Sequence, residues 1–236
     1  MGPVKRLLAR RLFGRRNLIT INDPYAEMAR LLSAESVTGI IDVGASHGRV
    51  ARRLLRRFPQ ATAYLFEPNP DYRHRLEDAA AGDPRLVPVF QAVGEEDGAA
   101  TLHVTASAGT TSLLKPARLL SARYASEARI VREEQVVVTT LDSWSRSRPH
   151  AAIQLMKLDI QGGELAALRG AGDLLGGTVK LIYTEVLFNP LYDGGGQFAQ
   201  IDILLRTYGF ALHDLFKPRY DNHGMLLWGN ALYLRT

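Results

Sequence analysis

Two kinds of hydrophobic pattern alternate along the first half of the chain. Short apolar runs rich in β-branched residues predict strands, and segments whose apolar residues recur every three to four positions predict helices. The predicted strands are 39–43, 62–66 and 86–93, and the predicted helices are 25–32, 50–58 and 72–81. Strands that alternate with helices indicate a parallel sheet with helices on both faces and ligands at the carboxyl ends of the strands.

The second half returns to this order after an irregular middle. Runs at 100–105 and 135–141 look like strands around a segment without a period, so we interpret about 98–140 as a cap-like insertion. Beyond it the pattern predicts strands at 153–160, 180–186, 210–215 and 231–234, and helices at 164–171 and 198–208. Two strands after the last helix indicate a terminal antiparallel hairpin. The sequence therefore predicts a single α/β domain over 23–236, built on a mostly parallel seven-stranded sheet.

Composition and charge narrow the class of protein. The absence of cysteine excludes disulfides and thiolate chemistry, and no apolar run approaches the roughly 18 residues that span a bilayer. The net charge of +5 is concentrated at one end, because residues 1–16 hold six cations and no acid. We interpret 1–22 as a basic amphipathic arm with a capacity for peripheral contact with an anionic membrane surface through residues 1–16. For the rest we expect no nucleic-acid binding and a cytoplasmic location, with the arm at the inner membrane surface if it binds there.

The first strand leads into a glycine-bracketed turn, the usual place of a ligand loop in such a sheet. A dinucleotide fingerprint requires glycine where this chain has Ser46 and Arg49. Asp42, at the strand end, would also place negative charge where a pyrophosphate sits. The ligand is therefore expected to lack phosphate. S-adenosylmethionine fits this requirement, because it carries a sulfonium cation and an amino-acid moiety.

A carboxylate follows the loop at the spacing expected for a ribose contact. Glu67 ends the second predicted strand about 20 residues beyond the loop, where an acidic residue accepts hydrogen bonds from a ribose diol. Gln91 and Ala92, at the end of the third, are then placed to border an adenine. The predicted cofactor-binding residues are Asp42, Gly44, Ala45, Ser46, Gly48, Glu67, Pro68, Gln91 and Ala92.

The same loop also fits a different chemistry. Residues 44–48 match G-x-S-x-G, the nucleophile elbow of α/β-hydrolases. Asp159 or Glu185 followed by His213 or His223 would complete such a triad. This alternative gives Glu67 no task. A binding protein that has lost catalysis is the other alternative.

A second acidic cluster lies at the end of the predicted strand 153–160 and just beyond it. Asp159 lies at its carboxyl end and should face the cofactor crevice, where it is suited to accept the proton of an acceptor hydroxyl. Glu164 fits either function or the first turn of a helix. Glu185 and Asn189 follow a later strand and could line an acceptor pocket. We assign no metal ligand, because the histidines lack metal-ligand spacing, although Asp159 and Glu185 leave magnesium open.

Several linked motifs carry a resemblance to a known family. They are IIDVGASHG at 40–48, LFEPNP at 65–70, QAVGEEDG at 91–98, TTLDSW at 139–144, LMKLDIQGGELAALRGA at 155–171 and IYTEVLFNPLY at 182–192. In these motifs the chain resembles the FkbM-type S-adenosylmethionine-dependent methyltransferases over roughly 37–215. The resemblance implies a Rossmann-like class I methyltransferase fold and O-methylation of a sugar, glycan or natural-product hydroxyl. It also implies catalytic roles for Asp159, Glu164 and Glu185. One departure is Gln161, where family members often carry Glu.

The predicted insertion would cap the acceptor site. Its Thr111 and Ser112, with Asn189, are the expected substrate contacts, and its arginines could hold an anionic or glycosylated acceptor. The expected partner is a small-molecule or glycan acceptor. The identity of the acceptor, the oligomeric state and metal dependence stay open.

Overall fold

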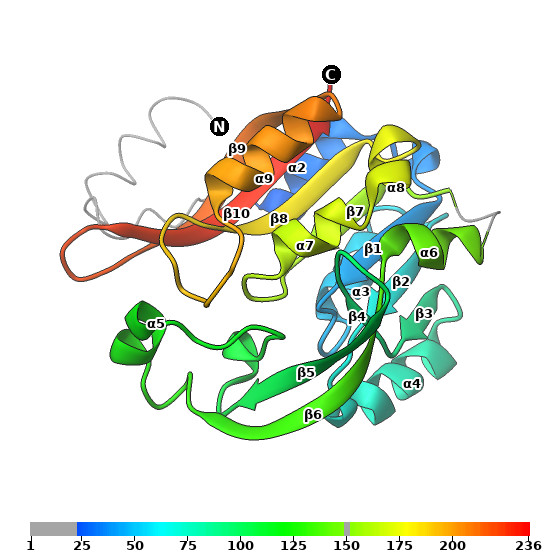
Figure 1. The fold of residues 1–236 in the computed structure, drawn as a ribbon. Helices are drawn as coiled ribbons and strands as arrows, with labels where there is room; N and C mark the ends of the chain where they lie inside the picture. The colour runs from blue at the N-terminus through cyan, green and yellow to red at the C-terminus, as the bar shows by residue number, and fades with distance from the viewer. Residues whose placement is uncertain (1–22, 149–151) are drawn as a thin grey trace.

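A twisted sheet of seven strands runs through the computed structural model, which describes residues 23–148 and 152–236 (Figure 1). Its strands are β1 (Gly39–Val43), β2 (Thr62–Phe66), β3 (Leu86–Val89), β7 (Leu155–Leu158), β8 (Leu181–Leu187), β9 (Phe210–Tyr220) and β10 (Leu226–Arg235). They lie in the order β3-β2-β1-β7-β8-β10-β9, and β10 is antiparallel to both neighbours. The mostly parallel seven-stranded sheet with a terminal hairpin is confirmed. The predicted arm, 1–22, lies outside the described residues.

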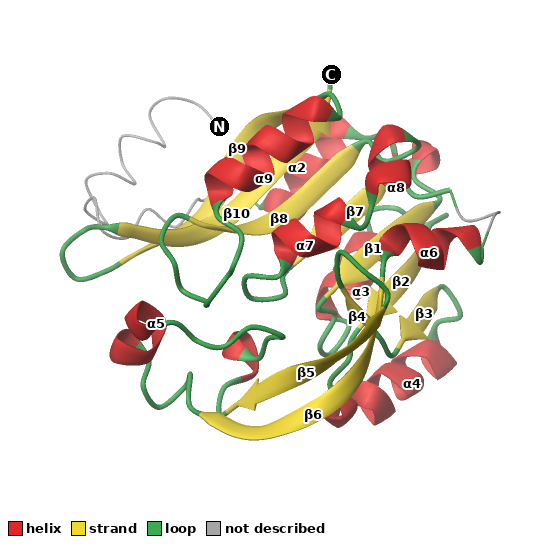
Figure 2. Ribbon diagram, viewed as in Figure 1, coloured by secondary structure: helices red, strands yellow, loops and turns green. Residues whose placement is uncertain are grey.

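Helices cover both faces of this sheet, because alternate residues of its strands are apolar on each side. Ile41 and Val43 of β1 belong to one core and Ile40 to the other. One face packs against α6 (Leu141–Arg146), α7 (Glu164–Arg169), α8 (Gly172–Gly176) and α9 (Phe198–Thr207), the other against α2 (Pro24–Leu31), α3 (Arg49–Leu55) and α4 (Arg73–Gly82). Figure 2 shows these two layers on either side of the sheet.

A second, smaller sheet lies beside the first. It consists of β4 (Ala92–Val93), β5 (Gly98–Thr105) and β6 (Ile130–Thr139), with β6 in the centre. Between β5 and β6 run a short 3₁₀ helix (Ala108–Thr110) and α5 (Arg118–Arg123). The long β5–β6 ribbon curves away from the main sheet, and α5 lies on the side of the β9–β10 hairpin (Figure 1). The segment that the sequence sets apart as an insertion therefore forms its own layer.

Several strand predictions are wrong in their boundaries. Strands β9 and β10 extend beyond the predicted 210–215 and 231–234, and three other differences affect the site. The predicted strand 86–93 is two strands, β3 and β4, which belong to different sheets because the chain bends at residues 90–91. The predicted strand 135–141 starts earlier and ends at Thr139, since the Thr140 hydroxyl accepts the Ser143 N–H and so caps α6. The predicted strand 153–160 is reduced to β7, which leaves Asp159 in the loop after it. Helices α5, α6 and α8 were not predicted.

The loops after β1, β2 and β7 meet at one end of the sheet. Gly44, with φ +76°, passes so close to Asp159 that a Cβ at this position would collide with the Asp159 carbonyl. This contact brings the first predicted loop and the second acidic cluster together. Within the described residues, no helix is long and apolar enough to cross a membrane.

Candidate cofactor and acceptor site

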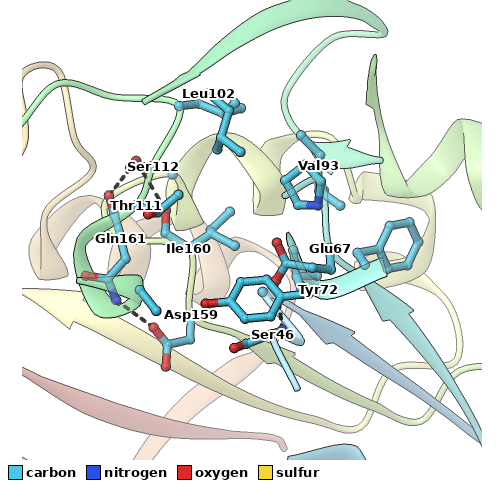
Figure 3. Close-up of a pocket in the computed structure, with 18 of the residues that line it drawn as sticks. Ser46, Glu67, Tyr72, Val93, Leu102, Thr111, Ser112, Asp159, Ile160 and Gln161 are labelled. Carbon is cyan, nitrogen blue, oxygen red and sulfur yellow. Dashed lines mark hydrogen bonds between the residues drawn. The ribbon is translucent and has the colours of Figure 1, made fainter. Parts of the chain in front are cut away.

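A cavity of about 220 Å³ opens between these loops and the small sheet. Its polar lining comes from Ser46, Glu67, Tyr72, Gln91, Thr111, Ser112, Asp159 and Gln161, and its apolar lining includes Phe66, Val93, Leu102 and Ile160. Figure 3 shows Glu67 and Tyr72 on the side opposite Thr111, Ser112 and Gln161. We call it the first cavity. It joins residues from β1, β2, β4, β5 and β7, or from the loops that follow them.

Glu67 is the anchored carboxylate of the first cavity. Its Oε2 accepts the Ser46 N–H at 2.8 Å, and its Oε1 accepts the Asn69 N–H at 3.0 Å. Burial raises its pKa, and the two backbone hydrogen bonds oppose that shift. Each carboxylate oxygen keeps a second lone pair, so the group can accept further hydrogen bonds from a bound diol.

Asp42 has a different position from the one the sequence suggested. It is fully buried below the loop, and its Oδ1 lies 2.9 Å from the Nζ of Lys157, its neighbour in register on β7. Lys157 also donates to the carbonyls of Val43 and Gly44. Burial acts to lower the pKa of Lys157, but the carboxylates of Asp42 and Asp159 outweigh it and raise the pKa. The pair fixes the backbone of the loop from beneath, and Asp42 is not part of the cavity lining.

Asp159 lines the first cavity and is held by its neighbour. The Nε2 of Gln161 donates to Asp159 Oδ1 at 2.8 Å, and the Oε1 of Gln161 accepts the Tyr192 hydroxyl at 2.9 Å. Burial and the charge of Glu185 raise the pKa of Tyr192, so its phenol stays protonated and donates. Asp159, Gln161 and Tyr192 thus form a chain of hydrogen bonds with a defined direction.

Glu164 supports the loop that carries Asp159. Its two carboxylate oxygens accept the N–H groups of Ile160 and Gly162 at 2.7 and 2.9 Å, and only 1% of the residue is exposed. Burial raises its pKa to about 7, with Asp159 adding to the shift. Glu164 lies in the first turn of α7, and its contacts are those of a clamp on the turn.

A second cavity of about 270 Å³ adjoins the first and shares Gly109 and Gln161 with it. Its lining residues are Ser107, Gly109, Thr110, Leu120, Tyr124, Glu127, Gln161, Glu185, Leu187, Leu191, Tyr192 and Trp228. Glu185 is 6% exposed, and its Oε2 has no hydrogen-bond partner among the described residues. Burial, and then the charges of Asp159 and Glu164, raise its pKa well above the ordinary value.

The structure brings most of the predicted site residues together and leaves a few outside. Gly44, Ser46, Glu67, Pro68, Gln91, Ala92, Thr111, Ser112 and Asp159 line the first cavity, and Glu185 lines the second. Ala45 and Gly48 shape the turn, in which the Gly48 N–H donates to the Ala45 carbonyl at 2.8 Å. Asn189 donates to the Leu226 carbonyl at 2.7 Å and so ties the β8 loop to the terminal hairpin.

The predicted substrate contacts of the insertion have partners of their own. Ser112 donates to the Gln161 carbonyl at 2.9 Å and accepts the Leu114 N–H. The Thr111 hydroxyl accepts the Thr105 N–H at 3.1 Å. Ser112 thus ties the insertion to the loop after β7, whereas the Thr111 contact lies within the insertion.

The sequence prediction missed residues that line the cavities from unexpected elements. Tyr72 precedes α4 and lines the first cavity, while Tyr124 and Trp228 line the second. For Gln161, which the sequence prediction left without a role, the signal was its place two residues after Asp159 in the strand-end turn. Nothing in the local sequence marks Trp228, because its place depends on the pairing of β10 with β8.

The serine-elbow alternative finds no support in the geometry. The Ser46 hydroxyl lies 2.9 Å from Nδ1 of His47, whose ring packs edge-on against Tyr72. Burial, followed by Arg75, Arg49 and Arg52, lowers the pKa of His47, so its surroundings do not favour the imidazolium that a triad stabilises. His213 instead pairs with Glu27 at 2.8 Å.

The lining of the first cavity fits S-adenosylmethionine. It contains the carboxylates of Glu67 and Asp159 but no lysine, arginine or histidine, which disfavours a phosphate and favours a cation. The apolar side chains suit an adenine. Within 23–148 and 152–236, no cluster of three or more histidine, cysteine, aspartate or glutamate residues is arranged to hold a metal ion.

Comparisons with known proteins point to one family of methyltransferases. The family model described as Methyltransferase FkbM domain matches residues 42–212. The chain is 28% identical to the 2-O-methyltransferase NoeI of Sinorhizobium fredii, over 66% of this chain and 65% of NoeI. It is 26% identical to Methyltransferase 1 of Beauveria bassiana, over 73% of this chain and 72% of that protein.

A solved structure shares the fold. The FkbM methyltransferase of Methylobacillus flagellatus KT superposes with a TM-score of 0.54 at 16% identity, covering 90% of this chain and 48% of that one. This chain therefore spans just under two thirds of NoeI and about half of the Methylobacillus protein.

Proposed function

Because this chain belongs to the Methyltransferase FkbM domain family, we propose that it transfers a methyl group from S-adenosylmethionine to a hydroxyl oxygen of a sugar, glycan or natural-product acceptor. Similarity to a 2-O-methyltransferase supports oxygen as the acceptor atom. The resemblance that the sequence motifs indicated is confirmed by the family match.

One observation carries the proposal. The first cavity has an anchored carboxylate at one end, Glu67, and a second one, Asp159, at the point where the second cavity joins it through Gln161. A cofactor can thus be held beside Glu67 while Asp159 meets the hydroxyl of an acceptor. A binding protein without catalysis would not need Asp159 at this junction.

The residues of the first cavity divide the binding of the cofactor among them. Glu67 would accept hydrogen bonds from the ribose hydroxyls, and Gln91 and Ala92 would border the adenine together with Phe66 and Val93. Gly44 lines the same cavity without a side chain and would border the methionine part. When bound, S-adenosylmethionine supplies an electrophilic methyl group on a sulfonium centre.

Asp159 serves the acceptor side of the reaction. Its carboxylate accepts the proton of the acceptor hydroxyl as the oxygen attacks, which is general-base catalysis. The Gln161 amide holds it in one orientation, and Glu164 fixes the loop beneath it. Ser112 ties the insertion to the Gln161 carbonyl beside the cavity, and an insertion that caps the site would exclude water from the reacting groups.

Calorimetric titration tests the cofactor. S-adenosylmethionine and S-adenosylhomocysteine should bind the wild type, and Glu67→Ala should weaken binding by roughly 1–3 kcal/mol through lost charge-assisted hydrogen bonds. Glu77→Ala, at an exposed glutamate of α4, is the matched control and should bind as the wild type does. A folded wild-type protein that binds neither compound would refute the proposal.

Asp159→Asn separates binding from transfer. With tritiated S-adenosylmethionine and a panel of hydroxyl-bearing glycosides, the variant should keep its cofactor affinity and lose roughly 10²–10⁴-fold in kcat, the usual contribution of a general base. Asp78→Asn, at an exposed position of α4, should leave both unchanged. A kcat within a factor of about three of the wild type would remove Asp159 from the role of base.

A further inference from the structure

The second cavity has an unusual charge distribution. Its lining includes Glu127 and Glu185, and Asp159 lies beyond the shared Gln161, whereas no lysine, arginine or histidine lines it. Glu127 is exposed at the rim, and its hydrogen bond from Ser126 lowers its pKa, so it is ionised. The buried cation on this side of the sheet, Lys157, is already paired with Asp42. A ligand in this cavity therefore faces the negative charges of Glu127 and Asp159 with no cation among the lining residues.

The surroundings of Glu185 favour a ligand that carries a hydroxyl group. It is more than nine-tenths buried, it lines the cavity, and its Oε2 lacks a hydrogen-bond partner among the described residues. A buried carboxyl oxygen without a partner is costly. A hydroxyl group of a ligand would satisfy it by donating a hydrogen bond. A carboxylate or phosphate would instead add a negative charge beside Glu127 and Asp159.

The remaining wall of the second cavity is aromatic and aliphatic. Trp228 on β10 and Tyr124 after α5 pack with their rings 6.0 Å apart, and Leu120, Leu187 and Leu191 complete the surface. An apolar wall with a few polar groups is typical of pockets that orient a small ligand. It suits a ring that presents carbon on one face and a hydroxyl at its edge.

The arginines of the insertion do not line either cavity, which is contrary to the expectation that they hold an anionic acceptor. Arg118, Arg123 and Arg129 are all exposed. Arg123 donates to Asn222 at the tip of the terminal hairpin and lies 5.6 Å from the Tyr124 ring. The positive charge of this segment is thus on its outer surface.

We propose that the second cavity is the acceptor site and that it selects uncharged, hydroxyl-bearing acceptors over anionic ones, with Glu185 and Trp228 as specificity-determining residues. This inference rests on the proposed function. It adds the location of the acceptor site and the charge that an acceptor must not carry.

Trp228 allows the charge of the cavity to be measured without a known acceptor. The chain has two tryptophans, so Trp144→Phe leaves Trp228 as the sole reporter. The measured quantity is the ratio of iodide quenching to acrylamide quenching of Trp228. This ratio should be at least about threefold lower than the ratio for free N-acetyltryptophanamide, because a potential of one kT changes the local ion concentration by about this factor. When each ion is normalised to its quenching of free N-acetyltryptophanamide, caesium should quench Trp228 more efficiently than iodide. If Trp144→Phe fails to fold, the difference between the wild type and Trp228→Phe supplies the same signal.

A matched pair of variants assigns the effect to the rim. Glu127→Gln should increase quenching by iodide, whereas Glu133→Gln, at an exposed position of β6 outside both cavities, should not. The proposal would be overturned if, in the protein that keeps Glu127, iodide and acrylamide quench Trp228 equally relative to free N-acetyltryptophanamide.

A second experiment tests the acceptor directly. Its probes are methyl β-D-glucopyranoside and methyl β-D-glucuronide, which differ by one carboxylate. With S-adenosylhomocysteine bound, the neutral glycoside should change the emission of Trp228, and the anionic one should require at least about tenfold higher concentration, equivalent to 1.4 kcal/mol. No response to either probe, or an equal response to both, overturns the proposal. Calorimetry with S-adenosylhomocysteine is done first, so a failure of the cofactor site is recognised separately.

Discussion

Four carboxylates near the ends of β1, β2 and β7 have different structural roles because each has different hydrogen-bond or ion-pair partners. Glu67 accepts backbone N–H groups and faces the first cavity, whereas Asp42 is paired with Lys157 below the loop. Asp159 is held by an amide, and Glu164 clamps the backbone of the turn. At this scale the role of an acidic residue follows from the donors that surround it.

Glu164 should make stability depend on pH. Its pKa in the folded protein is raised to about 7 by burial, so the folded state binds its proton more tightly than the unfolded state does. Its contribution is therefore greatest below pH 4.5 and is lost as the pH rises toward 7, by up to roughly 3 kcal/mol. Glu164→Gln cannot titrate, so the difference in unfolding free energy between wild type and variant should fall over this range.

Urea unfolding from pH 4.5 to 8 measures this difference. Glu77→Gln, at an exposed glutamate, serves as the control and should show no comparable trend. A difference between the wild type and Glu164→Gln that stays constant across the range would mean that the two backbone N–H donors keep Glu164 ionised throughout.

At the scale of elements, the site depends on how closely β1 and β7 come together at their ends. The turn after β1 can pass Asp159 only because Gly44 has no side chain and adopts a positive φ. The small sheet is attached on both sides of the first cavity. Arg132 of β6 pairs with Asp71 beside the Glu67 loop at 2.8 Å, and Ser112 bonds to Gln161. The cofactor loops and the insertion are thus one connected unit.

Gly44→Ala should damage the site at this junction. The added Cβ meets the Asp159 carbonyl, and the positive φ costs a non-glycine residue about 1–2 kcal/mol. We expect a loss of stability of at least that size and at least a tenfold loss in affinity for S-adenosylmethionine, measured by urea unfolding and calorimetry.

Gly82→Ala is the control for Gly44→Ala. A Cβ at Gly82, the last residue of α4, would meet open space. The control should be neutral or stabilising by up to about 1 kcal/mol. Wild-type affinity in Gly44→Ala would show that the loop can relax without loss of the site.

At the scale of the whole molecule, a bound cofactor would connect layers that are far apart in sequence. The lining of the first cavity runs from Val43 to Gly163 and includes both sheets. A ligand that binds only the folded protein stabilises it in proportion to its occupancy. The effect should therefore appear in global unfolding as well as in binding.

Thermal unfolding should report this coupling. At a concentration of S-adenosylmethionine about 100 times the Kd, the wild type should gain about 2.7 kcal/mol, which raises Tm by roughly 5–10 °C for a chain of this size. Glu67→Ala should lose most of this shift at the same concentration, and Glu77→Ala should keep it. An unchanged Tm in the wild type at a concentration shown by calorimetry to saturate it would contradict the assignment.

The sequence by itself determined the alternation of strands and helices, the glycine turn, Glu67 at the end of β2 and Asp159 at the carboxyl end of the strand that precedes it. These features follow from local periodicity and turn chemistry over short stretches of chain. The tertiary structure alone decided that Asp42 pairs with Lys157, that Gln161 lies between two cavities, and that Trp228 lines the second cavity. Those contacts depend on which strands become neighbours and how the hairpin packs beside the insertion. Such long-range packing leaves no periodic signal in the segments that take part in it.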